Sequence, residues 1–123
     1  GLYAVTGGAI YCDRSDVSYN DALSGYEGGG MSFLGGWLEV TNSRMAHNKA
    51  VHIACLGYVF GGGMVHNVDF DACVGTGVGG AIGFAGAAVD VSDVRISNSH
   101  ADLEGGAVYV STESPSISVT NAW

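Results

Sequence analysis

The sequence is poor in basic residues, in proline and in charge of either sign. Its 123 residues include four Lys and Arg against twelve Asp and Glu, which gives a formal net charge of −8. Because proteins bind nucleic acids and anionic membranes through clustered cations, this composition argues against both partners. The longest stretch with few polar side chains, residues 74–89, contains several glycines and is too short to cross a bilayer, so we predict no membrane insertion.

Glycine, in contrast, is abundant, with 21 residues in a chain that is 47% hydrophobic. Such a chain predicts a folded domain with many tight turns and not a disordered tail. The segment GTGVGGA, residues 75–81, matches the glycine pattern of dinucleotide-binding loops, which also requires a buried strand before it and a helix after it. The flanking segments alternate with polar residues or carry further helix-weakening glycines. We therefore interpret these glycines as turn residues and predict no cofactor.

An internal repeat sets the expected architecture. The segments VTNSRMAHNKA (40–50), VHNVDFDACVG (65–75) and VSDVRISNSHA (91–101) align, with a degenerate copy at 14–24 and a truncated copy at 119–123. A period of roughly 25 to 26 residues, with short apolar runs and no amphipathic helix, predicts an all-β parallel β-helix of about five coils. Coils of such a solenoid stack about 4.8 Å apart, so residues one period apart should lie directly above one another.

The aligned repeats define columns of residues that should stack. We interpret the Asn and Asp column as a structural ladder, because a side-chain amide can both donate and accept hydrogen bonds between coils. Its members are Asp16, Asn42, Asn67, Asp93 and Asn121. Glycine pairs should form the corners between strands, at Gly28, Gly29, Gly79, Gly80, Gly105 and Gly106. Two columns of apolar side chains should point into the interior, Tyr19–Met45–Phe70–Ile96 and Val40–Val65–Val91–Val119.

The outward face should carry a patch of opposite charges at Arg44, Asp69, Asp71 and Arg95. In the expected register Arg44 and Arg95 lie on either side of Asp69, and the two aspartates flank an inward phenylalanine. Opposite charges at neighbouring strand positions contribute about 0.2 to 1 kcal/mol to a sheet, so we interpret the patch as an exposed charge ladder. The alternative is a site for a sugar or for Ca²⁺, because the two carboxylates point outward together.

We predict no catalytic residue and no metal site. The four histidines, His47, His52, His66 and His100, share no column and have no helical zinc spacing, and no G-x-S-x-G nucleophile motif occurs. The three cysteines, Cys12, Cys55 and Cys73, also lack metal-like spacing. We expect them to be buried thiols that pack as small apolar residues, with one disulfide plus one free thiol as the alternative.

Two short motifs carry a family resemblance. GGAI occurs at Gly7–Ile10 and Gly79–Ile82, and MAHN at Met45–Asn48 has the form Φ-x-x-N, where Φ is a large apolar residue. With these motifs the chain resembles the polymorphic outer membrane protein repeats, the GG-A-I and F-x-x-N repeats of β-helical surface proteins. It is similar more broadly to pectin-lyase-like β-helices of adhesins and cell-wall proteins. The resemblance implies a right-handed β-helix at the cell surface or outside the cell.

These inferences lead to one expected function and one alternative. We expect residues 1–123 to form a single β-helix domain, either as a piece of a longer β-helix or as a subunit that stacks. Because a β-helix exposes unpaired strand edges at its ends, we expect end-to-end self-association. The expected function is structural or adhesive and not enzymatic, with a carbohydrate or a host-surface molecule as a further ligand. The alternative is a pectin-lyase-like β-helix that binds or cleaves polysaccharide.

Overall fold

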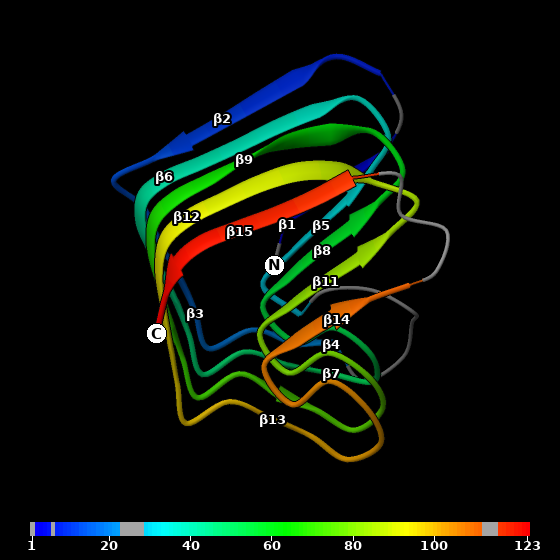
Figure 1. Ribbon diagram of the computed structural model, residues 1–123. Helices are drawn as coiled ribbons and strands as arrows, with labels where there is room; N and C mark the ends of the chain where they lie inside the picture. The colour runs from blue at the N-terminus through cyan, green and yellow to red at the C-terminus, as the bar shows by residue number, and fades with distance from the viewer. Residues whose placement is uncertain (1, 6, 23–28, 112–115) are drawn as a thin grey trace.

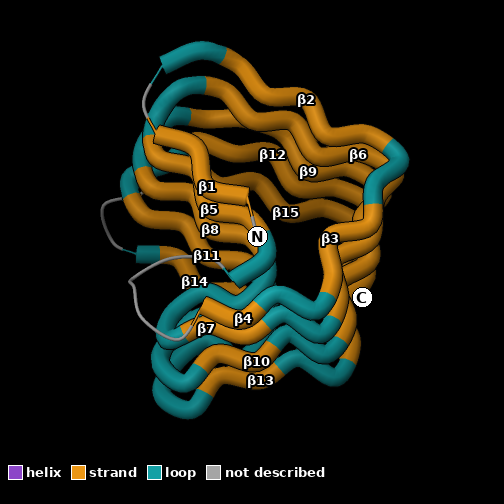
Figure 2. Tube along the Cα trace, turned by 180° about the vertical axis from the view of Figure 1, so that it is seen from behind, coloured by secondary structure: helices purple, strands orange, loops and turns teal. Residues whose placement is uncertain are grey.

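The computed structural model is an all-β parallel solenoid of about four turns (Figure 1). It describes residues 2–5, 7–22, 29–111 and 116–123, and no helix occurs among them. Each coil contributes strands to three parallel sheets, here called sheets A, B and C, which form the walls of the solenoid (Figure 2). The expected parallel β-helix fold is therefore confirmed.

The three sheets differ in strand length. Sheet A stacks short strands, in sequence order β1 (Leu2–Val5), β5 (Met31–Leu34), β8 (Leu56–Val59), β11 (Ile82–Ala85) and β14 (Val108–Val110). Sheet B holds the longest strands, β2 (Ala9–Asp13) with β3 (Asp16–Ser18), then β6 (Trp37–Ala46), β9 (Gly62–Asp71), β12 (Ala88–Ser97) and β15 (Ser116–Ala122). Sheet C stacks two-residue strands, β4 (Asp21–Ala22), β7 (Lys49–Ala50), β10 (Val74–Gly75) and β13 (His100–Ala101).

The inward columns of sheet B match the prediction over the middle coils. Val40 pairs with Val65 and Val65 with Val91, and these side chains are at most 3% exposed. Met45 pairs with Phe70 in the second column, and both are fully buried. Strand alternation explains the pattern, because every second residue of a strand faces the same side of the sheet.

Sheet A completes the core with a stack of aromatic rings. Phe33, Tyr58 and Phe84 occupy successive coils, with ring centroids 6.3 Å and 5.7 Å apart. Tyr58 is fully buried, and its hydroxyl donates a hydrogen bond of 2.9 Å to the carbonyl oxygen of Leu38. This bond satisfies the one polar atom of the side chain that burial would otherwise leave without a partner.

The expected register of the first coil was wrong by two residues. Val17, and not Tyr19, pairs with Met45 and enters the apolar column. Tyr19 is 78% exposed and stacks on His47 with ring centroids 4.8 Å apart. The physical reason is the number of residues that connect β4 to β5. Residues 23–30 separate β4 from β5, whereas only residues 51–55 separate β7 from β8. The first interval is therefore 28 residues, from Val17 to Met45.

Glycine pairs form the corner that precedes sheet A. Gly79 and Gly105 have φ of +71° and +61°, a region that glycine enters without steric cost, and Gly79 N donates to the carbonyl of Glu104. A Cβ on Gly80 would overlap the carbonyl oxygen of Gly106 in the next coil. A Cβ on Gly29 would likewise overlap backbone oxygens of the following coil. The predicted Gly28 lies outside the described residues.

The two GGAI motifs are not equivalent in the fold. Ile10 of the first motif pairs with Leu38 in sheet B, whereas Ile82 of the second pairs with Leu56 in sheet A. The motif therefore marks two different corners, each of which needs glycine, and not one repeated position.

The expectation of buried thiols was wrong for two of the three cysteines. Cys55 and Cys73 form a disulfide with a Cα–Cα distance of 5.7 Å, and both residues are fully buried. Cys12 is a free, half-buried thiol. The alternative of one disulfide plus one free thiol is therefore the correct one. The disulfide connects the residue before β8 in sheet A to the residue before β10 in sheet C, across the interior.

Candidate functional site: a polar groove along one corner

A left-handed residue bends each of the later strands of sheet B. Asn42, Asn67, Asp93 and Asn121 have φ between 48° and 53°, a conformation that Asn and Asp tolerate better than other side chains. The sheet register brings these four residues into one column. Asn67 Nδ2 donates to Asn42 Oδ1 at 2.8 Å, and Asn121 Nδ2 donates to Asp93 Oδ1 at 2.9 Å.

Asp16 does not belong to this column, contrary to the sequence prediction. It pairs with Arg44 in sheet B, and Arg14, with φ of 47°, is the left-handed residue at this corner of the first coil. The same 28-residue first interval explains the error. Asn42 donates instead to Asp13 Oδ1, at 2.8 Å. The ladder thus continues into the first coil through an aspartate that the sequence did not single out.

Asp13 is the acceptor at this corner. Its Oδ1 accepts hydrogen bonds from Asn42 and from Thr41 Oγ1, the latter at 2.9 Å, while its Oδ2 lies 2.8 Å from Arg14 Nε. The hydrogen bond from Asn42, with those from Arg14 and Thr41, lowers the pKa of Asp13 to about 2. These donors favour the ionised carboxylate, so the hydrogen bonds at this corner are strongest when Asp13 is charged.

The next corner of sheet B repeats this chemistry at Asp71. Its Oδ1 accepts from Asn98 Nδ2 at 2.8 Å and from Ser97 Oγ at 2.9 Å, and Asn98 again has a left-handed φ, of 52°. The hydrogen bonds from Asn98 and Ser97 lower the pKa of Asp71. A carboxylate in one coil that accepts from a hydroxyl and an amide in the next coil is therefore a recurring corner motif.

Acid is expected to weaken both corners. An Asp in an unfolded chain titrates near pH ~3.9, whereas the folded pKa of Asp13 is lowered to about 2 and that of Asp71 is also lowered. Depressed folded values mean stability that is present above the unfolded pKa and lost as pH falls through the folded pKa. The urea concentration at the unfolding midpoint, measured from pH 7 to pH 2.5, should therefore decrease once the pH is lowered below about 4. The fall should be shallower in the double variant Asp13→Asn, Asp71→Asn; parallel profiles would contradict the assignment.

Beside the ladder runs the predicted column of alternating charge. Asp16, Arg44, Asp69 and Arg95 are consecutive partners in sheet B. Arg44 lies at its centre, with Nη1 3.8 Å from Asp16 Oδ2, Nε 3.9 Å from Asp69 Oδ2 and Nη2 3.5 Å from Asp71 Oδ2. In the described part of the chain Arg95 forms no ion pair, and Asp69 Oδ1 is buried without a hydrogen-bond donor.

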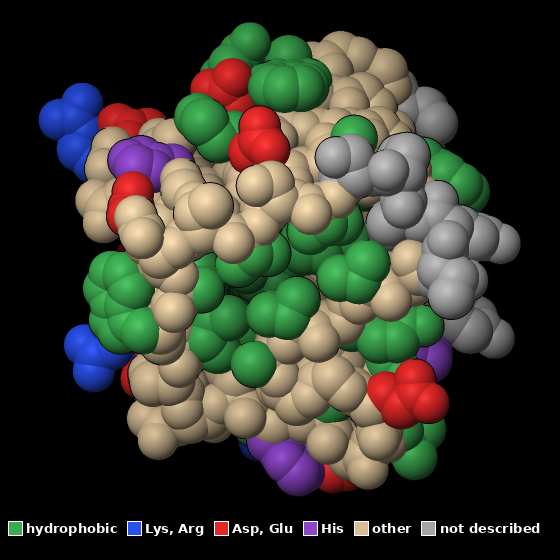
Figure 3. All heavy atoms as spheres, in the orientation of Figure 1, with side chains coloured by type: hydrophobic (Ala, Val, Ile, Leu, Met, Phe, Trp, Pro, Cys, Tyr) green, Lys and Arg blue, Asp and Glu red, His purple; other side chains and the backbone are tan. Residues whose placement is uncertain are grey.

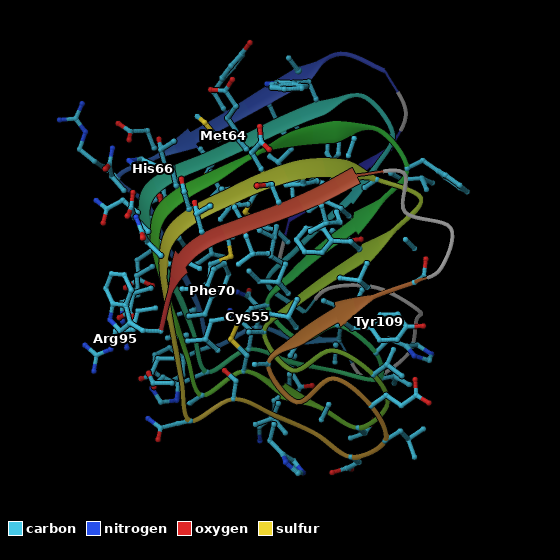
Figure 4. The ribbon with its side chains drawn as sticks, in the orientation of Figure 1. Cys55, Met64, His66, Phe70, Arg95 and Tyr109 are labelled. Carbon is cyan, nitrogen blue, oxygen red and sulfur yellow. A yellow bond between two sulfur atoms is a disulfide. The ribbon has the colours of Figure 1, made fainter. Side chains whose placement is uncertain are left out.

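The ladder and the charge column together line an open groove of about 620 Å³. The groove residues are Arg14, Ser15, Asp16, Asn42, Ser43, Arg44, Asn67, Val68, Asp69, Asp93, Arg95 and Trp123. Three of the four Lys and Arg residues of the chain are among them. Figure 4 shows Arg95 pointing away from the interior on this side, whereas Phe70 and Cys55 lie inside. At one end of the groove, Trp123 hydrogen-bonds through its backbone to Val94 and Ile96, and its side chain is 67% exposed.

The arrangement is suited to binding, and Asp71 does not fit the role of a general acid. Of the four predicted patch residues, Arg44, Asp69 and Arg95 line the groove. Asp71 lies outside the groove, where it accepts hydrogen bonds from Ser97 and Asn98. A general acid needs a carboxyl that is protonated near the working pH, and the pKa of Asp71 is lowered instead. Guanidinium, amide and indole groups side by side can bind a polar ligand by hydrogen bonds and stacking.

Arg14 and Trp123 are among the groove residues that sequence reasoning did not single out. Arg14 was hidden by the two-residue error in the first coil. The signal for Trp123 is its alignment with Arg44 and Arg95 within the truncated last repeat. In the described residues, no group of three or more His, Cys, Asp and Glu side chains is close enough to hold a metal ion.

No protein-family model, curated protein or solved structure matches this chain. Within the residues that the structure describes, no helix is long and apolar enough to cross a membrane.

Proposed function

We propose that the protein is a structural or adhesive, non-enzymatic β-solenoid that acts outside the cell and extends end to end by adding further coils. The observation that carries this proposal is the unpaired strand edges at the two ends of the described solenoid. Strands β13, β14 and β15 at one end, and β1, β2 and β4 at the other, pair on one side only within the described residues. Unpaired parallel strands are templates for further strands.

The core is open at the same two ends. Ile10, Cys12 and Val17 in the first coil pack against the core but are only partly buried. At the other end Val119 continues the valine column of sheet B, and it is 46% exposed where Val65 is fully buried. Figure 3 shows hydrophobic side chains gathered in the hollow of the face turned toward the viewer. Apolar surface of this kind is stabilised when another coil covers it.

The unequal sheets favour a head-to-tail contact. A copy turned upside down would present sheets A, B and C in the opposite order around the axis, so walls of unequal strand length could not superpose. A copy in the same orientation continues each wall with strands of its own kind and forms a contact that does not close. Among the described residues sheet C has four strands and sheet A has five, so sheets A and B would make this contact. Cys12 of one copy would then follow Val119 of its neighbour in the valine column.

Two observations support a place outside the cell. The Cys55–Cys73 disulfide is of the kind that persists in oxidising compartments. The GGAI and Φ-x-x-N motifs resemble the polymorphic outer membrane protein repeats, and the right-handed pectin-lyase-like architecture of surface proteins is the finer fold that we propose on that basis.

The experiment is a measurement of assembly on the purified chain. Sedimentation velocity across a protein concentration series and negative-stain electron microscopy are expected to show elongated species one solenoid wide. Val119→Lys should abolish them, because it places a charge in the interior column of the contact. Thr120→Lys adds the same charge to the next residue, whose column faces outward, and should leave assembly intact.

A covalent readout fixes the register. Strand neighbours lie about 4.8 Å apart, within the Cα range that a disulfide spans. Val119→Cys should therefore give a ladder of oxidised multimers with the native Cys12, whereas Thr120→Cys should give none. A monomer at all concentrations, or equal loss of assembly in both lysine variants, would overturn the proposal.

A second candidate function is binding of a polysaccharide in the groove. The observation that favours it is the guanidinium of Arg95, which forms no ion pair with any described residue. It lies between Asp69 and the exposed Trp123 in a groove that contains three of the four Lys and Arg residues. Affinity electrophoresis in gels that contain polysaccharide should show retardation that Arg95→Gln removes. Retention of binding in that variant, or cleavage of the polymer that Asp71→Ala abolishes, would argue against a pure binding groove.

A further inference from the structure

The outer face of sheet B carries an aromatic and acidic cluster away from the groove. Tyr11, Glu39, Met64 and Asp90 are consecutive partners on β2, β6, β9 and β12, and Trp37 lies two residues before Glu39 on the same face. We call these five residues the side platform. Figure 3 shows hydrophobic and acidic side chains together over these strands at the top of the view, and Figure 4 shows Met64 on the opposite side of the sheet from Phe70.

The indole of Trp37 is held in place before any ligand arrives. Its Nε1 donates a hydrogen bond of 2.8 Å to Glu39 Oε1. The next residue in its column is Gly62, and the six-membered part of the ring lies 3.6 to 3.7 Å from where a Cβ of that glycine would be. The ring therefore covers the bare backbone of the neighbouring strand, yet Trp37 is 44% exposed and Tyr11 is 69% exposed. A fixed and exposed ring loses little entropy on binding.

The charge of the platform is negative and is not neutralised by the chain itself. In the described residues Glu39 and Asp90 form no ion pair. No Lys or Arg occurs in residues 9–13, 37–41, 62–66 or 88–92, which form this part of sheet B. The four basic residues all lie elsewhere, at Arg14, Arg44, Lys49 and Arg95.

We propose that the side platform binds a basic, extended segment of a partner protein. A Lys or Arg of that segment stacks its charged group on the face of Trp37 or Tyr11, an interaction that favours a cation over an aromatic ring. Glu39 and Asp90 are two strands apart in their column, so their carboxylates lie roughly 10 Å from one another and each takes its own cation. The thioether of Met64 between them contacts the aliphatic stems of the basic side chains. The net charge of −8 steers such a segment toward the protein.

The test uses the full chain and a fluorescein-labelled Gly-Ser peptide with a lysine at every third position, at 150 mM NaCl. Fluorescence anisotropy should show saturable binding, and the same peptide with glutamates should not bind. The double variant Glu39→Gln, Asp90→Asn is expected to raise Kd about tenfold. The matched control Asp21→Asn, Glu104→Gln removes two exposed carboxylates outside sheet B and should change Kd less than twofold. Trp37→Leu, which keeps the net charge, should raise Kd about threefold.

Two outcomes would overturn the proposal. Equal weakening in the control double variant would mean that the peptide binds through net charge and not at the platform. Quenching of Trp37 fluorescence by a neutral cello-oligosaccharide, measured in a Trp123→Phe background, together with no binding of the lysine peptide, would make the surface a sugar-stacking platform. Circular dichroism of each variant establishes that the fold is retained.

Discussion

Replacing Cys55 and Cys73 together by alanine is expected to lower the free energy of unfolding by about 2 to 4 kcal/mol. The disulfide links residues that are 18 apart in sequence, and both are fully buried between sheets A and C. Removing it increases the conformational freedom of the unfolded chain and leaves a space in the buried core. The effect is large because each coil of a solenoid is held only by its neighbours.

Guanidinium-induced unfolding followed by circular dichroism measures this change. Treatment of the unaltered protein with a reductant should lower its midpoint as well, whereas the alanine variant should not respond to reductant. Cys12→Ala is the matched control, because it removes the half-buried free thiol of the first coil, and its effect should be under about 1 kcal/mol. Equal stability of the oxidised and reduced protein would mean that the bond contributes nothing to folding.

Replacing Asn48 by alanine is expected to cost about 2 to 4 kcal/mol. Asn48 is the largest fully buried polar side chain in the described core. Its Nδ2 donates to the carbonyl of Val17 at 2.7 Å, and its Oδ1 accepts from the backbone N and from Nδ2 of Asn20, both at 3.0 Å. The substitution leaves backbone groups of the neighbouring coil without their partner, and a buried unsatisfied group costs about 1 to 3 kcal/mol.

Asn98→Gly is the control for Asn48, because it removes an asparagine side chain at an exposed corner and glycine adopts the left-handed φ of 52° without steric cost. Its effect on the free energy of unfolding should be about 1 kcal/mol, the contribution of one exposed hydrogen bond. Asn48→Asp keeps the shape but places a carboxylate next to the carbonyl of Val17, so it should destabilise at neutral pH at least as much as alanine. Similar midpoints for the Asn48 and Asn98 variants would show that burial does not govern the contribution of these amides.

The Asn48 column shows how far a motif can be followed from sequence. The Φ-x-x-N form of Met45–Asn48 recurs as Val17-x-x-Asn20, and in the structure Val17 pairs with Met45 while Lys49 N donates to the carbonyl of Asn20. The motif was recognised only once, because a constant period placed the first coil two residues out of register. A connection between β4 and β5 that is three residues longer than the one between β7 and β8 was enough to hide the second copy.

The candidate site, too, was predicted only in part from the sequence. The neighbours of Asp69 in the charge column, Arg44 and Arg95, were predicted because strand alternation and a regular repeat fix which residues face outward together. The groove that they line was not predicted. It exists because left-handed residues bend the strands beside this column, and a bend in the backbone has no signature in hydrophobic alternation.

The sequence by itself determined that this chain stacks in parallel coils, which side chains face the core in the middle coils, that glycine pairs form corners and that asparagines stack in a ladder. These features follow from a period that repeats several times, because stacked strands reward the same residue type at the same position. Only the tertiary structure decided the pairing of Cys55 with Cys73, the register of the first coil, the groove and the side platform. The disulfide depends on which corners meet across the interior. The register of the first coil, which also places Tyr11 beside Glu39 in the side platform, depends on the length of one connection. The groove depends on left-handed residues that bend the strands, and none of these features alters the repeat.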